Sequence, residues 1–275
     1  MNTIIQYFDS IPSLHRSLIL AGGIAFFWLL ETGFPLFNFR YKKWKHATIN
    51  FFFTLTTIVI NFVLAFILLS TSDWTQSQNI GLLTFFPQSN TLLYAFVGLL
   101  GLDLISAYFV HWVEHKVPFM WRFHLIHHTD IHVDTTTANR HHPGESVFRF
   151  VFTTLAVLIM GAPVWMVMLY QGLSVVLSQF NHANIQLPKG LDKMLSWIIV
   201  TPNMHHVHHH FQLPQTDSNY GNIFAIWDRI FGTFQYMPQE KIQYGIDTHM
   251  AEEEHNSISK MLKIPFEPSR KPPGR

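Results

Sequence analysis

The chain has 275 residues, a formal net charge of +1 and only 13% charged residues, with 26 phenylalanines and 8 tryptophans. This aromatic, charge-poor balance, with a mean hydropathy of +0.17, is typical of a membrane protein, and the net charge gives no reason to expect a nucleic-acid partner. The absence of cysteine excludes disulfides, thiolate metal sites and iron–sulfur clusters held by cysteine.

Three segments are long and apolar enough to cross a bilayer as helices, for which about 20 residues suffice. They are residues 17–37, 49–69 and 91–110. Glu31 in the first segment is expected near the interface at the helix end, because Pro35 follows closely. The region 17–110 is therefore predicted to hold about three transmembrane helices of an all-α integral membrane protein.

The loop between the first two segments is basic, whereas residues 71–90 between the second and third contain no lysine or arginine. The basic residues of the first loop are Arg40, Lys42, Lys43 and Lys45. The positive-inside rule places this loop in the cytoplasm. The third segment ends on the same side and leads directly into His111, so the histidine-rich region that begins there is predicted to lie at the cytoplasmic face.

Residues 150–180 carry no charge, but they are too few for two full crossings, which need about 40 residues. Gly161, Ala162 and Pro163 lie at the midpoint and break helices. The pattern predicts a helical hairpin that turns near Pro163 deep in the bilayer, with a buried hairpin of the soluble type as the alternative.

The remaining segments complete a single domain over residues 1–275. Residues 191–200 are predicted to form an interfacial helix, and the aromatic residues 222–234 are expected to pack under the histidines. The catalytic region is predicted to span residues 111–235, with the hairpin inside it. A basic, proline-containing tail over residues 256–275 is predicted to be mobile.

Fourteen of the 18 histidines lie between residues 111 and 210, in clusters with spacings of three and four residues that share one helix face. Adjacent histidines point about 100° apart on a helix, so one member of a pair can serve each of two metals. A tetrahedral zinc site needs only three or four protein ligands, so the number of histidines favours two metals in an all-histidine cage. The predicted ligands are His111, His115, His124, His127, His128, His142, His182, His205, His208 and His209.

The sequence indicates the tenth ligand, and the residues that hydrogen-bond to the ligands, less directly than the other nine ligands. Either His141 or His142 is expected to contribute, and His142, just before Pro143, is preferred. Metal-bound imidazoles usually donate their second N–H to a carboxylate or carbonyl. The predicted residues behind the ligands are Asp103, two turns before His111, and Asp228, followed by Arg140 and Glu145.

Two other functions are compatible with part of the pattern. His111, Glu114 and His115 spell H-x-x-E-H, a motif of zinc peptidases in which the glutamate is the general base, so a zinc-dependent membrane hydrolase is one alternative. A non-enzymatic metal-handling membrane protein is the other. Transport predicts polar residues spread through the spans, whereas these histidines gather at one end.

Over residues 103–233 the chain resembles the fatty acid hydroxylase superfamily, also called the sterol desaturase family. The motifs that carry the resemblance are D-x-x-x-x-Y-F-V-H-W-V-E-H, W-R-F-H-L-I-H-H, R-H-H-P-G-E, T-P-N-M-H-H-V-H-H and N-Y-G-N-I-F-A-I-W-D-R-I-F-G-T. Some members carry a further H-x-x-x-H pair where this chain has Ser178 and His182, and His142 is expected to supply the missing ligand.

The resemblance implies an integral membrane enzyme that uses two histidine-ligated iron ions, dioxygen and electrons to hydroxylate or desaturate a lipid taken from the bilayer. Zinc could replace iron in a purified sample, because it outcompetes ferrous iron at many nitrogen sites. No dinucleotide fingerprint such as G-x-G-x-x-G is present, so electrons are expected from a separate donor protein. A multi-pass protein of this kind belongs in a bacterial inner membrane or in the endoplasmic reticulum of a eukaryote. The identity of the lipid, and the choice between hydroxylation and desaturation, stay open.

Overall fold

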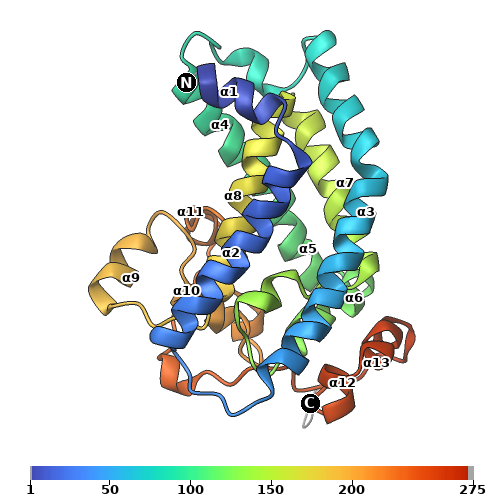
Figure 1. The fold of residues 1–275 in the computed structure, drawn as a ribbon, viewed down its shortest axis with the longest axis vertical. Helices are drawn as coiled ribbons and strands as arrows, with labels where there is room; N and C mark the ends of the chain where they lie inside the picture. Colours follow the sequence, from blue (N-terminus) through green and yellow to red (C-terminus); the bar gives the residue numbers. More distant parts are fainter. Residues whose placement is uncertain (1, 272–275) are drawn as a thin grey trace.

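The computed structural model describes residues 2–271, which form helices joined by loops, with isolated β-bridges and no strands (Figure 1). This confirms the predicted all-α class. Within the described residues, four helical segments are long and apolar enough to cross a membrane, namely Ser13–Gly33, Lys43–Phe85, Thr91–Lys116 and Pro143–Met160. The first three correspond to the three predicted spans and the fourth to the first arm of the predicted hairpin.

The first helices line one side of the bundle. They are α1 (Asn2–Asp9), α2 (Ser13–Gly33) and α3 (Lys43–Ser77). The 35 residues of α3 extend over about 52 Å, more than the roughly 30 Å of a bilayer core. Phe62 and Phe66 near its middle are 82% and 78% exposed, as expected of side chains that face lipid. The predicted apolar stretch 49–69 is only the middle of this helix. The helix continues into polar residues at both ends, because those residues are also compatible with helical structure.

The third span runs without a break into the histidine region. It consists of α4 (Thr91–Asp103), a π-helical turn η2 (Leu104–Phe109) and α5 (Val110–Lys116), and the side chain of Asn90 accepts from the Leu93 amide at its start. The backbone changes direction before Pro118, which begins α6 (Pro118–His128). A short 3₁₀ segment, η3 (Thr135–Asn139), then leads to the hairpin.

The hairpin consists of α7 (Pro143–Met160) and α8 (Val164–His182). Gly161 ends α7 with a left-handed φ of 65°, and Pro163 precedes α8, so the turn is formed by the predicted residues. The arms are longer than the predicted range 150–180, because Glu145 and Arg149 pair with each other inside the bundle and do not end the helix.

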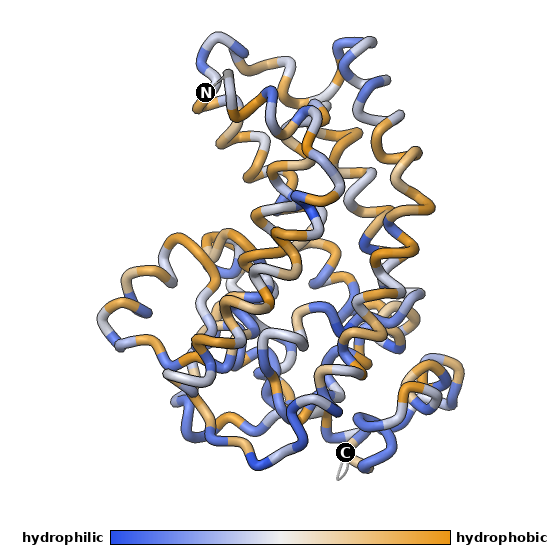
Figure 2. The backbone as a smooth tube through the Cα atoms, viewed as in Figure 1, coloured by the Kyte–Doolittle hydropathy of each residue, from blue (hydrophilic) through white to orange (hydrophobic). Residues whose placement is uncertain are grey.

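The tip of the hairpin reaches the far end of α3. The side chains of Ser72 and Gln76 donate to the carbonyl oxygens of Ala162 and Gly161, both at 2.7 Å. The hairpin therefore extends to the level at which the polar connection after α3 begins. Figure 2 shows hydrophobic residues along the middle of the long helices and hydrophilic residues toward both ends.

Replacing Gly161 with valine is expected to lower the free energy of unfolding by about 2 kcal/mol or more, because a β-branched residue is strained at positive φ. A Cβ atom there would also clash with the Ile80 carbonyl oxygen. The thermal unfolding midpoint of the purified protein in detergent measures the effect. Gly22→Ala is the control, because a Cβ atom at Gly22 meets nothing within 4 Å. Equal midpoints for the two variants would contradict the expectation.

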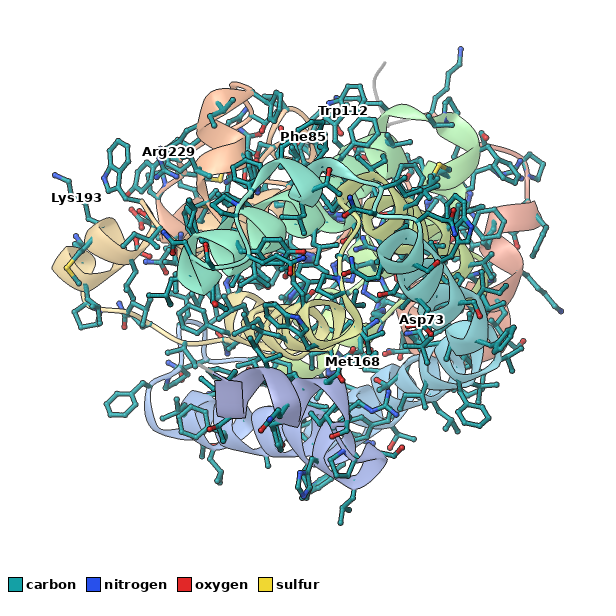
Figure 3. The ribbon with its side chains drawn as sticks, turned by 90° about the horizontal axis from the view of Figure 1, so that it is seen from above. Asp73, Phe85, Trp112, Met168, Lys193 and Arg229 are labelled. Atoms are coloured by element: carbon teal, nitrogen blue, oxygen red, sulfur yellow. The ribbon has the colours of Figure 1, made fainter. Side chains whose placement is uncertain are left out.

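Shorter helices follow the hairpin and build the lower part of the molecule (Figure 1). They are α9 (Lys189–Leu195), α10 (Pro202–His208), η4 (Gln215–Asp217), α11 (Ile226–Ile230), η5 (Gln239–Lys241), α12 (Glu252–Asn256), α13 (Ile258–Lys263) and η6 (Ile264–Phe266). Seen along the bundle axis, Trp112 of α5 lies at the edge of the molecule (Figure 3).

The predicted mobile tail is wrong for its first part. Residues 258–266 are helical, and Met261 is fully buried. The guanidinium of Arg140 donates to the Met261 sulfur at 3.1 Å and to the His255 carbonyl at 2.9 Å, so this segment is part of the core. The many basic residues and prolines of this segment suggested a mobile tail, although it contains apolar residues that are buried. Residues 272–275 of the predicted tail lie outside the described residues.

Candidate metal centre

Nine histidines gather in two adjacent groups at one end of the bundle. In each group, one ring nitrogen per residue lies within 4.8 Å of the others. The first group is His111, His115, His124, His128 and His208, and the second is His127, His182, His205 and His209. All nine belong to the ten predicted ligands.

Four helices supply the two groups. His111 and His115 lie one turn apart on α5, and His182 is the last residue of α8. On α6 the adjacent residues His127 and His128 belong to different groups. The adjacent residues His208 and His209, at the end of α10, are divided in the same way. This arrangement follows from the helix geometry, because consecutive side chains point about 100° apart.

The ring nitrogens converge as ligands of a shared ion would. The Nε2 atom of His124 lies 3.1 Å from that of His111 and 3.2 Å from that of His128. In the second group, the Nε2 atom of His182 lies 3.0 Å from that of His127 and 3.1 Å from that of His205. Two imidazole nitrogens about 2.0–2.1 Å from one ion, at 90–110° to each other, would be about 2.9–3.4 Å apart. The distances therefore fit two metal positions.

Several buried ring nitrogens in the groups have no hydrogen-bond partner within residues 2–271. They include Nε2 of His115, Nε2 of His208 and both ring nitrogens of His209. Buried polar atoms without a partner are rare and costly, so an ion bound to these nitrogens would remove the penalty. Burial also lowers the pKa of His124 to about 3 and that of His205, His208 and His209 well below the usual value. The rings are therefore neutral at physiological pH, which is the form that binds metals.

Outer acceptors fix the orientation of five rings by receiving the Nδ1–H. Such an acceptor leaves Nε2 free to face the group. The pairs are His111 with the Tyr220 carbonyl (2.9 Å), His115 with the Asp217 carboxylate (3.1 Å), His124 with the Glu145 carboxylate (2.7 Å), His182 with the Ser178 carbonyl (2.7 Å) and His208 with the Ser218 carbonyl (2.7 Å).

Of the predicted outer residues, only Glu145 contacts a histidine of the two groups. One of its oxygens accepts from Nδ1 of both His124 and His141, at 2.7 Å each, and Arg149 donates to the same oxygen at 3.0 Å. His124, His141 and Glu145 thus form a further cluster, in which the Glu145 carboxylate accepts hydrogen bonds from both rings.

Asp228 contacts the histidines only indirectly, through the backbone of Tyr220. Its carboxylate accepts from the amides of Tyr220 at 2.7 Å and Gly221 at 2.9 Å, and the Tyr220 carbonyl in turn receives His111. The buried carboxylate therefore holds the loop that orients His111. Asp228 lies on α11, directly after this loop, so its carboxylate reaches the loop's backbone amides and not an imidazole.

Asp103 and Arg140 hydrogen-bond to none of the nine histidines, which corrects the predicted direct contact. Asp103 accepts from the Phe224 amide and the Trp227 indole, because that loop crosses α4 at this point. Arg140 is fully buried and donates to the Ile126 carbonyl at 3.1 Å, so it braces the end of α6.

The structure does not bring His142 into either group. Its Nδ1 accepts from the Gly144 amide at 3.0 Å and caps α7, since Pro143 begins the helix directly after it. The neighbouring His141 lies nearer, and its ring stacks on His127 with centroids 4.9 Å apart. Both of its nitrogens are occupied, Nδ1 by Glu145 and Nε2 by the Ala138 carbonyl.

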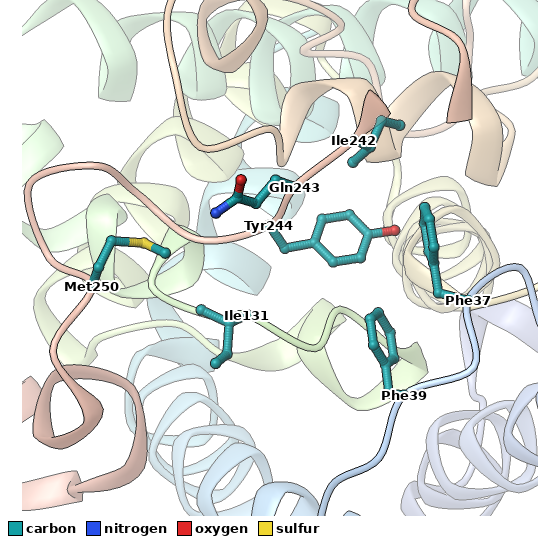
Figure 4. A pocket seen from close by; sticks show the side chains of 7 residues that line it. All are labelled: Phe37, Phe39, Ile131, Ile242, Gln243, Tyr244 and Met250. Carbon is teal, nitrogen blue, oxygen red and sulfur yellow. The ribbon is translucent and has the colours of Figure 1, made fainter. Parts of the chain in front are cut away.

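A second connection, which no motif indicated, runs from a pocket to the second group. The Tyr244 hydroxyl donates to His206 Nδ1 at 2.7 Å, and His206 Nε2 donates to the His182 carbonyl at 3.2 Å. The Tyr244 ring lines a cavity of about 320 Å³ together with Phe37 and Phe39 (Figure 4). His206 therefore supports the backbone that carries His182.

Glu114 of the H-x-x-E-H motif is fully buried and faces α7. Its carboxylate pairs with the Arg149 guanidinium at 2.6 Å. A general base must reach a water molecule or a substrate. An ion-paired carboxylate without solvent access does not offer this, so the geometry argues against a hydrolase centred on Glu114.

Comparison with known proteins agrees with this geometry. A family model described as fatty acid hydroxylase matches residues 95–233. The ornithine lipid hydroxylase OlsE of Rhizobium tropici is 28% identical over 147 residues, which cover 53% of this chain and 44% of that protein. Alkylglycerol monooxygenase is 36% identical over 151 residues in Xenopus tropicalis and 34% identical over 151 residues in Homo sapiens, in both cases covering 54% of this chain and 32% of that protein.

The aligned part therefore spans less than half the length of these relatives. No solved structure matches the chain significantly. The family match covers half of the chain and includes all nine histidines of the two groups. The chain belongs to the fatty acid hydroxylase family.

Proposed function

We propose that the protein is a membrane enzyme that hydroxylates a lipid, with two iron ions held by the two histidine groups and dioxygen as co-substrate. The observation that carries the proposal is the pair of buried groups whose neutral imidazoles converge on two adjacent points at one end of the spanning helices. The similarity to a lipid hydroxylase and to a monooxygenase supports the reaction class.

Bound iron would supply the oxidation of an unactivated C–H bond by dioxygen, which side chains alone cannot perform. The balanced reaction consumes RH, O₂, two electrons and two protons and yields ROH and water. The role of the chain is to bring the nine rings together, to orient five of them through the outer acceptors and to keep the centre buried. The electrons would come from a separate donor protein, because the chain has no nucleotide-binding fingerprint.

The basic loop supports a cytoplasmic position for the centre. The Tyr41 hydroxyl of this loop donates to Asp134 at 2.7 Å, only six residues beyond His128. The loop with Arg40, Lys42 and Lys43 therefore lies at the same end of the bundle as the histidines. The positive-inside rule then assigns that end to the cytoplasm.

Metal analysis with Mössbauer spectroscopy, on protein enriched in iron-57 and purified without oxygen, tests the proposal. We expect about two irons per chain with an exchange-coupled signal, followed by lipid hydroxylation when a reductant is added. The exposed His15 provides a control, because His15→Ala should keep the full metal content. A single zinc, with no iron after anaerobic reconstitution, would contradict the proposal.

Replacing Tyr244 with phenylalanine is expected to weaken metal binding in the second group by less than the 10- to 100-fold that a direct partner of a ligand contributes, because Tyr244 reaches His182 only through His206. The substitution leaves His206 Nδ1 buried without a donor. Competition with a chelator measures the affinity. Tyr236→Phe, at a residue that is 77% exposed, is the matched control. The same affinity in both variants would show that His206 needs no donor.

A further inference from the structure

Large apolar side chains are exposed side by side on α9, on the residues that follow it and on α11. Met194, Trp197 and Ile198 are 59%, 64% and 62% exposed, and Ile230 and Phe231 of the second segment are 59% and 55% exposed. Clusters of this kind on a folded protein mark an interaction surface. These five residues are called the apolar platform below.

The two segments form one continuous surface. The guanidinium of Arg229 lies 4.6 Å from the ring centroid of Trp197 and 4.4 Å from that of Phe234. The Ala225 amide donates to the Ile198 carbonyl at 3.2 Å. The platform is therefore held together by its own contacts and presents one face.

The platform lies where α2 reaches its lower end. The backbone of Ile185 pairs with Pro35, two residues after α2 ends, and α9 begins four residues after Ile185. Figure 1 shows α9 at the level of the lower half of α2. The seven residues of α9 are far too few to cross a bilayer, for which about 20 are needed. A short helix at the level where a spanning helix ends is placed to lie along the interface.

Cations border the platform. Lys193 of α9 and Arg229 of α11 lie at the same side of the molecule when it is viewed along the bundle axis (Figure 3). Long cationic side chains beside aromatic rings are typical of the membrane interface, where the charge reaches lipid phosphates and the stem stays with the acyl chains. Asp228, next to Arg229, is fully buried and bound to backbone amides, so it does not oppose anionic lipid at the surface.

We propose that the apolar platform is seated in the headgroup region of the leaflet beside the histidine groups, with Lys193 and Arg229 facing phospholipid phosphates. The occupant is the bilayer that the spanning helices cross. The helix α11, which contributes Ile230 to the platform, also carries the buried Asp228, whose carboxylate holds the Tyr220 loop behind His111. Contact with the leaflet would therefore fix the height of the candidate centre relative to the lipid chains.

The absence of cysteine allows a direct test. Single variants Met194→Cys and Ile230→Cys would carry a nitroxide label in the full chain, reconstituted in nanodiscs of phosphatidylcholine and phosphatidylglycerol. Collision of the label with dissolved oxygen and with a water-soluble nickel chelate reports its depth. Phe62→Cys, in the middle of α3, is the lipid-facing control, and Glu253→Cys, at an exposed acidic residue of α12, is the aqueous control.

We expect both platform labels to favour oxygen over the nickel chelate, as at position 62 but at a shallower depth. Nickel access equal to that at position 253 would overturn the proposal and place the platform in water. Low access to both reagents would also overturn it, because it would show that protein covers the platform. Circular dichroism of each variant confirms that the helices are retained.

Discussion

Replacing His182 with alanine is expected to remove the metal from the second group and to reduce lipid hydroxylation below about 1% of the original rate. The Nε2 atom of His182 lies 3.0 Å from that of His127 and 3.1 Å from that of His205, so it occupies the middle of the group. Only four histidines form this group, and a metal site that loses one of three or four ligands loses most of its affinity. Metal content should fall from about two ions per chain to about one.

The matched control is His142→Ala. His142 caps α7 through the Gly144 amide and lies outside both groups, so this variant should keep both metals and lose only the cap, worth about 1 kcal/mol. Elemental analysis of the two variants separates the outcomes. Loss of a metal in His142→Ala, with retention in His182→Ala, would show that the ligand set proposed here is wrong.

Replacing Glu145 with glutamine is expected to lower metal affinity in the first group by 10- to 100-fold and to reduce turnover to a similar extent. Glu145 accepts from Nδ1 of His124 and of His141, and it pairs with Arg149 inside the bundle. An amide in its place has only one oxygen and no charge. The orientation of the His124 ring would then be poorly determined, and Nε2 would no longer be directed steadily at its group.

Glu114→Gln is the control that isolates this effect. Glu114 pairs with the same Arg149, at 2.6 Å, but lies 3.6 Å from His124 Nδ1, too far for a normal hydrogen bond. Both variants remove one negative charge beside Arg149, but only Glu145→Gln replaces the charged acceptor of the His124 ring with the weaker, neutral oxygen of an amide. Metal affinity by chelator competition should therefore fall much further in Glu145→Gln. Loss of activity in Glu114→Gln with full metal content would instead revive the hydrolase alternative.

Features that follow from local spacing were predictable from the sequence. The separation of His127 from His128 into two groups follows from the angle between neighbouring residues on a helix, and the turn at Gly161 to Pro163 follows from residues that break helices. The spans were visible in apolar composition, although their ends were not, because α7 continues through Glu145 and Arg149 once the two are paired.

Features that depend on tertiary packing were not predictable from the sequence. The acceptors behind His111, His182 and His208 are backbone carbonyls, which every residue has, so no residue type indicates them. The position of His142 outside both groups was equally hidden, because His142 is the N-cap of α7 and its ring turns to the Gly144 amide. The buried position of Met261 depends on a guanidinium more than a hundred residues away.

The division of neighbouring histidines between the groups has a consequence for how this centre can vary. His127 with His128, and His208 with His209, each join the two groups through a single peptide bond. The spacing between the two groups is therefore a property of covalent geometry at two independent places, and a shift of α6 or α10 would carry both groups together. Changes in the surrounding spans α2, α3 and α7 can alter what lies around the groups without altering that spacing. Under the proposed function, such a centre could accept different lipids while its two metal positions stay constant.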